Sequence, residues 1–342
     1  MKARGWATST WMKSFNRSVK AMARAARPAR RTLARSIKTR ASARASVDAS
    51  QGSWTAGMAL GPAGTRRYRL FRPPEIQAGE RLPLVVMLHG CGQDANDFAA
   101  STRMNLLARR ERFLVLYPEQ DRLSNAQRCW NWYETRNGRA QAEAALVLAA
   151  IDQICLLQNA DPSRVALIGL SAGAGLAALL ATRHPHRFAA VVMHSGVAPG
   201  VADSTATALA AMRGRRLQPA QALDDARETL PWPPLLVIQG ESDHVVVARN
   251  GAAAAQVWAT AVGATATPGR VVQRGQRYPM TVTDFKRHGR TLATLVTVER
   301  LGHAWSGGAS RLPFGDAKGP DASRMAWAFA ARQFRQTAPQ SP

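Results

Sequence analysis

Residues 165–173 hold the feature with the clearest chemical meaning, a serine between glycines in Gly169-Leu170-Ser171-Ala172-Gly173. A short apolar run precedes it, and an Ala- and Leu-rich stretch over residues 174–182 follows it. This order predicts a strand, a sharp turn and a helix, with the Ser171 hydroxyl exposed on the turn. Glycines are needed on both sides because any side chain there would collide with neighbouring backbone. Ser171 is therefore a candidate nucleophile, although an ordinary glycine-rich turn could have the same sequence.

A serine hydroxyl is a weak nucleophile near neutral pH unless a histidine accepts its proton and a carboxylate orients that histidine. Two later strand ends supply these groups. The apolar run 235–238 leads into a loop containing Asp243, and the run 294–298 leads into a loop containing His303. Because the carboxyl ends of parallel strands lie at one edge of a sheet, Ser171, Asp243 and His303 are predicted to form a catalytic triad in that chain order.

Other residues compete for two of these roles. Glu241 is a rival for the acid, and Asp243 could instead cap the helix predicted after it. His89 and His194 also follow strand-like runs, but the chain order favours His303 as the base. His89 is expected to order the loop in which it lies.

An oxyanion hole requires two backbone N–H groups beside the nucleophile. Ala172, directly after the serine, is the expected source of the first. The apolar run 84–88 breaks at His89-Gly90-Cys91, where the backbone can fold back toward the serine, so Cys91 is the expected source of the second. The Cys91 side chain could also serve only to fill buried space, which is compatible with this role of its backbone amide.

The segments that must position these groups alternate between strand-like and helix-like from about residue 48. Compact apolar runs predict buried parallel strands over residues 84–88, 113–116, 165–168, 189–193, 235–238 and, last in the sheet, 294–298. Helical spacing is found over residues 98–109, 140–158, 174–183, 247–262 and 322–335. Residues 67–71 alternate as in an antiparallel edge strand. The pattern predicts an α/β fold, a mostly parallel doubly wound sheet with helices on both faces.

The chain has 342 residues and a net charge of +24, and its basic excess is concentrated at the N-terminus. Residues 1–47 contain 13 Lys and Arg and no Asp or Glu. Within them, residues 11–31 have the spacing of a basic amphipathic helix, which could contact an anionic membrane, a lipid-coated granule or nucleic acid, or serve as a transit peptide. A solvated leader is the simpler alternative. We expect a catalytic domain over residues 48–337 and a short tail over 338–342.

No apolar run is expected to reach the length of a membrane span, and the N-terminus lacks the apolar stretch of an ordinary secretory signal. An intracellular or granule-associated location is therefore favoured. The three cysteines, Cys91, Cys129 and Cys155, are too few for a disulfide scaffold and lack metal-ligand spacing, so no metal is expected.

Taken together, the motifs resemble the esterase family typified by poly(3-hydroxybutyrate) depolymerases, which also contains feruloyl and acetyl-xylan esterases. The matching stretches are 88–93 (Leu-His-Gly-Cys-Gly-Gln), 129–133 (Cys-Trp-Asn-Trp-Tyr), 169–173, 240–243 (Gly-Glu-Ser-Asp) and 302–305 (Gly-His-Ala-Trp). The resemblance, which extends over about residues 55–335, implies an α/β-hydrolase fold and hydrolysis of carboxylic esters through an acyl-enzyme on Ser171. It implies no metal and no organic cofactor. The implied substrate is an ester, which includes polymeric or oligomeric hydroxyalkanoates.

The same resemblance implies a disulfide between Cys91 and Cys129, and an extracellular or periplasmic location as the alternative to an intracellular one. Trp130, Trp132 and Trp305 are candidates for the walls of the acyl or alcohol pocket, or else core aromatics.

Three other functions are compatible with parts of this sequence. A feruloyl or acetyl-xylan esterase and an acyltransferase would share the triad. A non-catalytic protein acting through its basic N-terminus on nucleic acid or anionic surfaces is the alternative from another class. The intact Ser171, Asp243 and His303 positions argue against that third alternative, and with it against a nucleic-acid partner.

Overall fold

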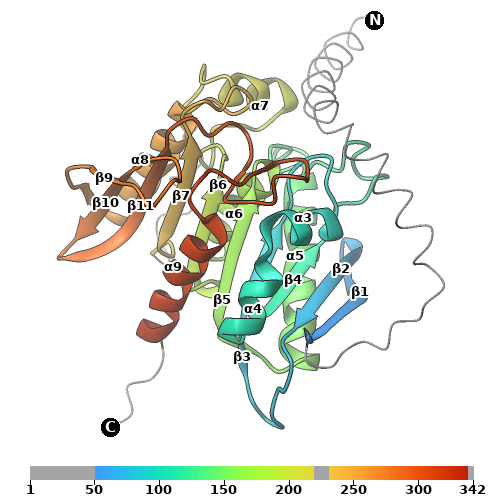
Figure 1. Ribbon diagram of the computed structural model, residues 1–342. Helices are drawn as coiled ribbons and strands as arrows, with labels where there is room; N and C mark the ends of the chain where they lie inside the picture. Colours follow the sequence, from blue (N-terminus) through green and yellow to red (C-terminus); the bar gives the residue numbers. More distant parts are fainter. Residues whose placement is uncertain (1–50, 219–230, 338–342) are drawn as a thin grey trace, which may run out of the picture.

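A computed structural model describes residues 51–218 and 231–337. The predicted N-terminal segment 1–47, its amphipathic part 11–31 and the tail 338–342 all lie outside the described residues. The described chain is built on an 11-stranded sheet of order β1-β2-β4-β3-β5-β6-β7-β11-β10-β8, with β9 paired to β10 (Figure 1). This sheet provides the edge on which the candidate site lies.

The strands of this sheet are β1 (Ser53–Gly61), β2 (Gly64–Arg72), β3 (Leu82–Leu88), β4 (Leu114–Pro118), β5 (Ala160–Leu170), β6 (Ala190–His194), β7 (Leu235–Gly240), β8 (Thr265–Ala266), β9 (Arg270–Val272), β10 (Met280–Arg287) and β11 (Arg290–Val298). Six neighbours, β4, β3, β5, β6, β7 and β11, run parallel. Each overlaps one of the apolar runs predicted to be a buried strand, although the runs 113–116 and 189–193 begin one residue before β4 and β6. Strands buried on both faces are apolar throughout, so these runs identify them.

Helices cover both faces of the sheet, which confirms the predicted α/β-hydrolase architecture (Figure 1). The helices are α3 (Ala95–Thr102), α4 (Met104–Glu111), α5 (Arg139–Leu157), α6 (Ala172–Arg183), α7 (Thr205–Met212), α8 (Arg249–Val262) and α9 (Ala322–Thr337). Buried residues of α3, α4 and α9 share one core with one face of the sheet, and those of α5, α6 and α8 share a second core with the other face. A two-stranded sheet of β12 (Trp305–Ser306) and β13 (Gly315–Asp316) follows β11.

Two predictions of local structure need correction. β2 contains residues 67–71 and is antiparallel as expected, but it is not the edge strand, because β1 pairs with it on the outer side. The single helix predicted over 98–109 is two helices, α3 and α4, separated by Arg103 in the left-handed conformation with φ 56°. That backbone conformation is uncommon for a residue other than glycine, and it ends a helix.

Helix α5 also departs from expectation, since by length and mean hydropathy it could span a membrane. In the structure its buried side chains, including Val147, Ile151 and Ile154, pack in the core under the sheet. Core packing therefore accounts for these buried apolar residues, whereas Leu156 and Leu157 at the end of the helix are exposed.

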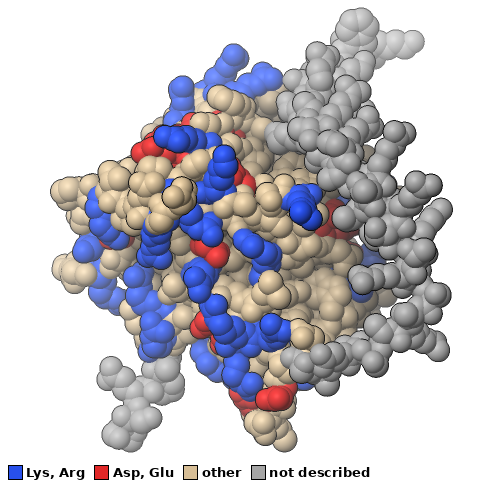
Figure 2. All heavy atoms as spheres, viewed as in Figure 1, with Lys and Arg blue, Asp and Glu red and all other residues tan. Residues whose placement is uncertain are grey.

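Basic side chains gather on the face shared by α4, α9 and the β10–β11 hairpin (Figure 2). Exposed members include Arg109, Arg287, Arg324, Arg332 and Arg335. The described part of the chain thus contributes to the basic excess.

Candidate active site

Ser171 lies on the turn between β5 and α6, as the glycine-flanked motif predicts. Its backbone has φ 56° and ψ −117°, a strained conformation for a residue with a side chain. A Cβ atom on Gly169 would lie 2.2 Å from the carbonyl oxygen of Gly173, and one on Gly173 would lie 2.1 Å from that of Leu88. Both glycines are therefore required by backbone contacts, and the turn holds Ser171 beyond the end of the strand.

Asp243 and His303 are in contact. Asp243 follows β7, His303 follows the adjacent β11, and His303 Nδ1 lies 2.8 Å from Asp243 Oδ2. The other carboxylate oxygen accepts hydrogen bonds from the N–H groups of Val245 (2.9 Å) and Val246 (2.8 Å). Burial alone would raise the pKa of Asp243, but the His303 ring and these two N–H groups outweigh it and lower the pKa. The carboxylate is thus ionised and aimed at the imidazole.

Glu241, the rival for the acid, is exposed, whereas Asp243 is 2% exposed and is the carboxylate hydrogen-bonded to His303 Nδ1. Asp243 closes the turn before α8 but does not cap that helix, which begins at Arg249 and has Ala248 as its N-cap.

Hydrogen bonds also connect the serine turn to the histidine loop. The N–H of Ser171 donates to the carbonyl of His194 at the end of β6 (2.8 Å), and the N–H of Ser306 donates to His194 Nε2 (3.1 Å). His194 therefore contacts both the turn of Ser171 and the loop that carries His303. In the sheet, the strands that end at Ser171, Asp243 and His303 are separated only by β6.

His194 is fully buried and serves as a structural group. Burial lowers its pKa to about 3, and because Nε2 accepts a hydrogen bond, the proton of the neutral ring is on Nδ1, which faces Ser195 Oγ at 3.1 Å. Trp305 stacks on this ring with centroids 5.0 Å apart and donates to Ser323 Oγ. Trp305 is not among the residues that line the pocket, so of the two alternatives for it the core aromatic is correct and the pocket wall is not.

His89 orders the loop after β3, as expected. Burial lowers its pKa to about 4, Nε2 accepts from the N–H of Gln120 (3.1 Å), and Nδ1 lies 2.8 Å from the Gly90 carbonyl. The N–H groups of Gly90, Gly92 and Gln93 are all bonded. That of Cys91 has no hydrogen-bond acceptor among the described residues. The first N–H of α6, at Ala172, likewise has no acceptor within its helix.

An apolar pocket lies beside these two amides and Ser171. Cys91 and Cys129 line it and are joined by a disulfide, the pairing implied by the resemblance. Of the three tryptophan candidates, Trp130 and Trp132 line the pocket. The remaining lining residues are Tyr133, Gly196, Val197, Ala208, Met212 and Val246.

The sequence does not identify most of these remaining residues. Ala208 and Met212 belong to α7, an element not predicted, which lies between β6 and β7. The position of that segment between two strands that border the site was the available signal, because lids are often inserted there. Within residues 51–218 and 231–337, no group of three or more His, Cys, Asp or Glu side chains is arranged to hold a metal ion.

The sequence of this chain is similar to the sequences of known proteins. A family model described as Esterase PHB depolymerase matches residues 66–270. Poly(3-hydroxyalkanoate) depolymerase C of Paucimonas lemoignei is 35% identical over 175 residues, which are 49% of this chain and 42% of that protein. Feruloyl esterase B of Neurospora crassa is 27% identical over 193 residues, 53% of this chain and 65% of that protein. The chain therefore spans less than two thirds of either relative.

Solved structures share the fold at low sequence identity. An acetyl xylan esterase from Aspergillus awamori superposes with a TM-score of 0.59 at 19% identity, covering 74% of this chain and 94% of that chain. An acylaminoacyl peptidase from Pyrococcus horikoshii gives 0.52 at 12% identity, covering 85% of this chain and 43% of that one. Esterases and peptidases both have this fold, so the fold alone does not identify the bond that is cleaved.

Proposed function

Because the chain belongs to the Esterase PHB depolymerase family, we propose that it hydrolyses carboxylic esters through a triad of Ser171, His303 and Asp243. One observation carries the proposal. A serine held on a strained turn lies at the same sheet edge as a buried Asp243–His303 pair whose Nδ1 and Oδ2 are 2.8 Å apart. This combination supplies a nucleophile, a base and an orienting carboxylate.

In the first half of the reaction, Ser171 Oγ attacks the ester carbonyl carbon while His303 Nε2 takes the hydroxyl proton. Asp243 accepts the Nδ1 proton in a hydrogen bond, which fixes the tautomer and stabilises the imidazolium. The tetrahedral intermediate collapses, and His303 returns the proton to the leaving alcohol. Water then attacks the acyl-enzyme by the same proton transfers and releases the acid.

The amides of Cys91 and Ala172 form the oxyanion hole of this mechanism. Both residues line the pocket with Ser171, and both N–H groups lack a partner in their own loop or helix. Donors already in place stabilise the developing charge without reorganisation. The hydrogen bonds that fix Gly90, Gly92 and Gln93 hold the Cys91 amide in position.

The test is Ser171→Ala, with the exposed Ser242→Ala as a matched control. We expect Ser171→Ala to lose about 10⁴-fold or more of its rate on 4-nitrophenyl acetate, with its circular dichroism spectrum unchanged. Ser242→Ala is expected to keep the wild-type rate. Full activity of Ser171→Ala would refute the proposal.

We further propose hydroxyalkanoate esters, oligomeric or polymeric, as the preferred substrates. Support comes from the depolymerase relative and from a pocket lined by apolar and aromatic side chains. Feruloyl and acetyl-xylan esters are the competing substrates. Comparing kcat/KM for 3-hydroxybutyrate oligomers, methyl ferulate and acetylated xylan oligomers decides among them, and a preference for either of the last two contradicts this assignment.

Contact with an intracellular granule or an anionic membrane through residues 11–31 is also a proposal. It is supported by the 13 basic and no acidic residues of segment 1–47. Deleting residues 1–45 should reduce co-sedimentation with polymer granules or anionic vesicles while leaving hydrolysis of a soluble ester intact. Unchanged sedimentation contradicts the contact.

A further inference from the structure

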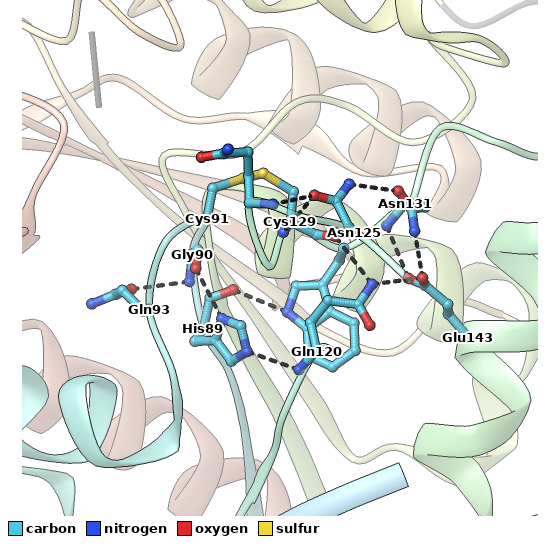
Figure 3. The surroundings of a disulfide bond; sticks show 11 residues. His89, Gly90, Cys91, Gln93, Gln120, Asn125, Cys129, Asn131 and Glu143 are labelled. Atoms are coloured by element: carbon cyan, nitrogen blue, oxygen red, sulfur yellow. Dashed lines mark hydrogen bonds between the residues drawn. A yellow bond between two sulfur atoms is a disulfide. The ribbon is translucent and has the colours of Figure 1, made fainter. Parts of the chain in front are cut away.

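A buried polar network lies near the Cys91–Cys129 disulfide, where Figure 3 labels three of its members, Gln120, Asn131 and Glu143. Its central members are Arg66, Gln120, Asn131 and Glu143, which are 3%, 2%, 1% and 4% exposed. They come from β2, the loop after β4, the loop before α5 and α5 itself. Buried charges are costly unless they are paired and hydrogen-bonded, so such a network needs an explanation.

Glu143 is the acceptor on which the network converges. Its Oε1 accepts from Gln120 Nε2 and from Asn131 Nδ2, each at 2.6 Å, and its Oε2 accepts from the Asn131 N–H at 2.9 Å. Hydrogen bonds donated to a carboxylate are stronger than hydrogen bonds between neutral groups. Glu143 therefore fixes both the backbone and the side chain of Asn131.

Asn131 lies in the middle of residues 129–133, which we call the aromatic loop. Four of these five residues, Cys129, Trp130, Trp132 and Tyr133, line the pocket beside Ser171. The carboxylate of Glu143 thus fixes the only member of the loop that is not in the pocket lining, and through it the four that are.

Gln120 connects the same network to residues 89–93, the loop after β3 that carries the Cys91 amide and that we call the oxyanion loop. Its side chain donates to the Cys129 carbonyl (3.0 Å) as well as to Glu143, and its backbone N–H donates to His89 Nε2 (3.1 Å). Trp130 adds a second connection, from its Nε1 to the His89 carbonyl (3.0 Å). The disulfide is therefore not the only connection between these two loops.

Arg66 supplies the opposite charge. It donates to Gln120 Oε1 at 2.6 Å and lies over the ring of Trp130, 5.1 Å from its centroid. Since Gln120 lies between Arg66 and Glu143, the two charges compensate each other across an amide that both hold in one orientation. Asp121 also acts on this guanidinium, so removing the Glu143 charge would take away one of its two counter-charges.

We infer that Glu143 is a positioning residue, which sets the substrate selectivity of the pocket by fixing the aromatic loop against the oxyanion loop. The inference rests on the proposed function, because it assigns the pocket beside Ser171 to the ester. Glu143 does not line the pocket, so it acts on the substrate only through Asn131 and Gln120.

The experiment compares Glu143→Gln with wild type on a series of 4-nitrophenyl esters from acetate to octanoate. The new amide cannot accept at both former oxygen positions, so at least one buried donor of Asn131 or Gln120 loses its acceptor. We expect a flattened chain-length profile, in which the ratio of kcat/KM between the best and worst ester falls about 5-fold or more. Rates are divided by the number of sites that a phosphonate labels, so that unfolded protein does not enter the comparison.

Asp284→Asn is the matched control, because Asp284 also accepts side-chain bonds from two partners, Thr294 and Arg270, but on β10. It should lower stability without changing the profile. Glu143→Asp, which keeps the charge, should retain part of the wild-type selectivity. If Glu143→Gln does not fold, Asn131→Ala provides the same measurement.

An active wild type whose profile is unchanged in Glu143→Gln and Asn131→Ala overturns the inference alone. A profile that flattens equally in Asp284→Asn also overturns it, since general destabilisation would then explain the effect. A wild-type chain that hydrolyses none of the esters refutes the proposed function, and the inference with it.

Discussion

Asp243→Asn is the most informative single change, because it alters the charge and the donor pattern at one buried position and almost nothing in shape. In the wild-type structure, Oδ1 of this carboxylate accepts from Val245 and Val246, and Oδ2 faces His303 Nδ1 at 2.8 Å. The Asp243 side chain has no exposed surface, so water cannot replace either set of bonds.

The size of the effect follows from these contacts. The new amide can satisfy the two backbone N–H groups only with its oxygen, which leaves its NH₂ facing His303 Nδ1. Nδ1 must then accept, so the neutral ring carries its proton on Nε2, the nitrogen that has to take the serine proton. We expect kcat to fall about 10⁴-fold, equivalent to about 5 kcal/mol of transition-state stabilisation.

Hydrolysis of 4-nitrophenyl acetate at pH 7 to 9 measures the loss, with active sites counted by a phosphonate. The control is Glu241→Gln, the same change of acid to amide two residues away on an exposed side chain, and it should stay within about 2-fold of wild type. An Asp243→Asn variant that keeps more than about a tenth of the rate would refute the role of Asp243. A loss of equal size in Glu241→Gln would do so as well.

Three further outcomes are expected. Reduction of the Cys91–Cys129 bond, whose cysteines are 38 residues apart, should lower the free energy of unfolding by about 4 kcal/mol, and equal urea midpoints with and without dithiothreitol would contradict this. His89 and His194 are neutral in the fold with pKa values of about 4 and about 3, so unfolding takes up protons once the pH falls below the unfolded value of about 6.5. In urea denaturation, the free energy of unfolding should fall on acidification, by up to about 2.7 kcal/mol per pH unit between about pH 5.5 and 4.5. A free energy of unfolding that does not change over this pH range would be inconsistent with buried neutral rings. Met212→Ala should enlarge the pocket and raise kcat/KM for octanoate relative to acetate about 5-fold or more, while Met212→Leu, close in volume, should not.

The parallel strands could be predicted from the sequence because burial on both faces makes each of them a continuous apolar run. β1 could not, since its sequence Ser-Trp-Thr-Ala-Gly-Met-Ala-Leu-Gly has no such run and Met58 and Leu60 are exposed. Arg103 ends a helix without the glycine or proline that would mark the break. In each case the missing information is tertiary, since pairing or packing overrides a weak local preference.

The residues of the candidate site likewise include some that could be predicted from the sequence and some that could not. Ser171 and its glycines are a local motif, and Asp243 and His303 are found from strand ends and chain order. Trp305 lies two residues from His303 yet faces the core, because the direction of a side chain in a loop is not given by its position in the sequence. Arg66 and Glu143 lie far apart in the chain and meet only when β2 and α5 come together, so no sequence pattern identifies their network.

Helix α7 contributes Ala208 and Met212 to the pocket and is secured by its own last residue, since the Met212 carbonyl accepts from the N–H of Val247 and the side chain of Asn250. The proposed catalytic residues and this part of the pocket wall therefore come from different segments of the chain. Substitutions at Ala208 and Met212 are expected to change the shape of the pocket at positions outside the strand ends that carry Ser171, Asp243 and His303. A laboratory library confined to residues 205–212 would therefore vary the pocket wall without touching Ser171, Asp243 or His303.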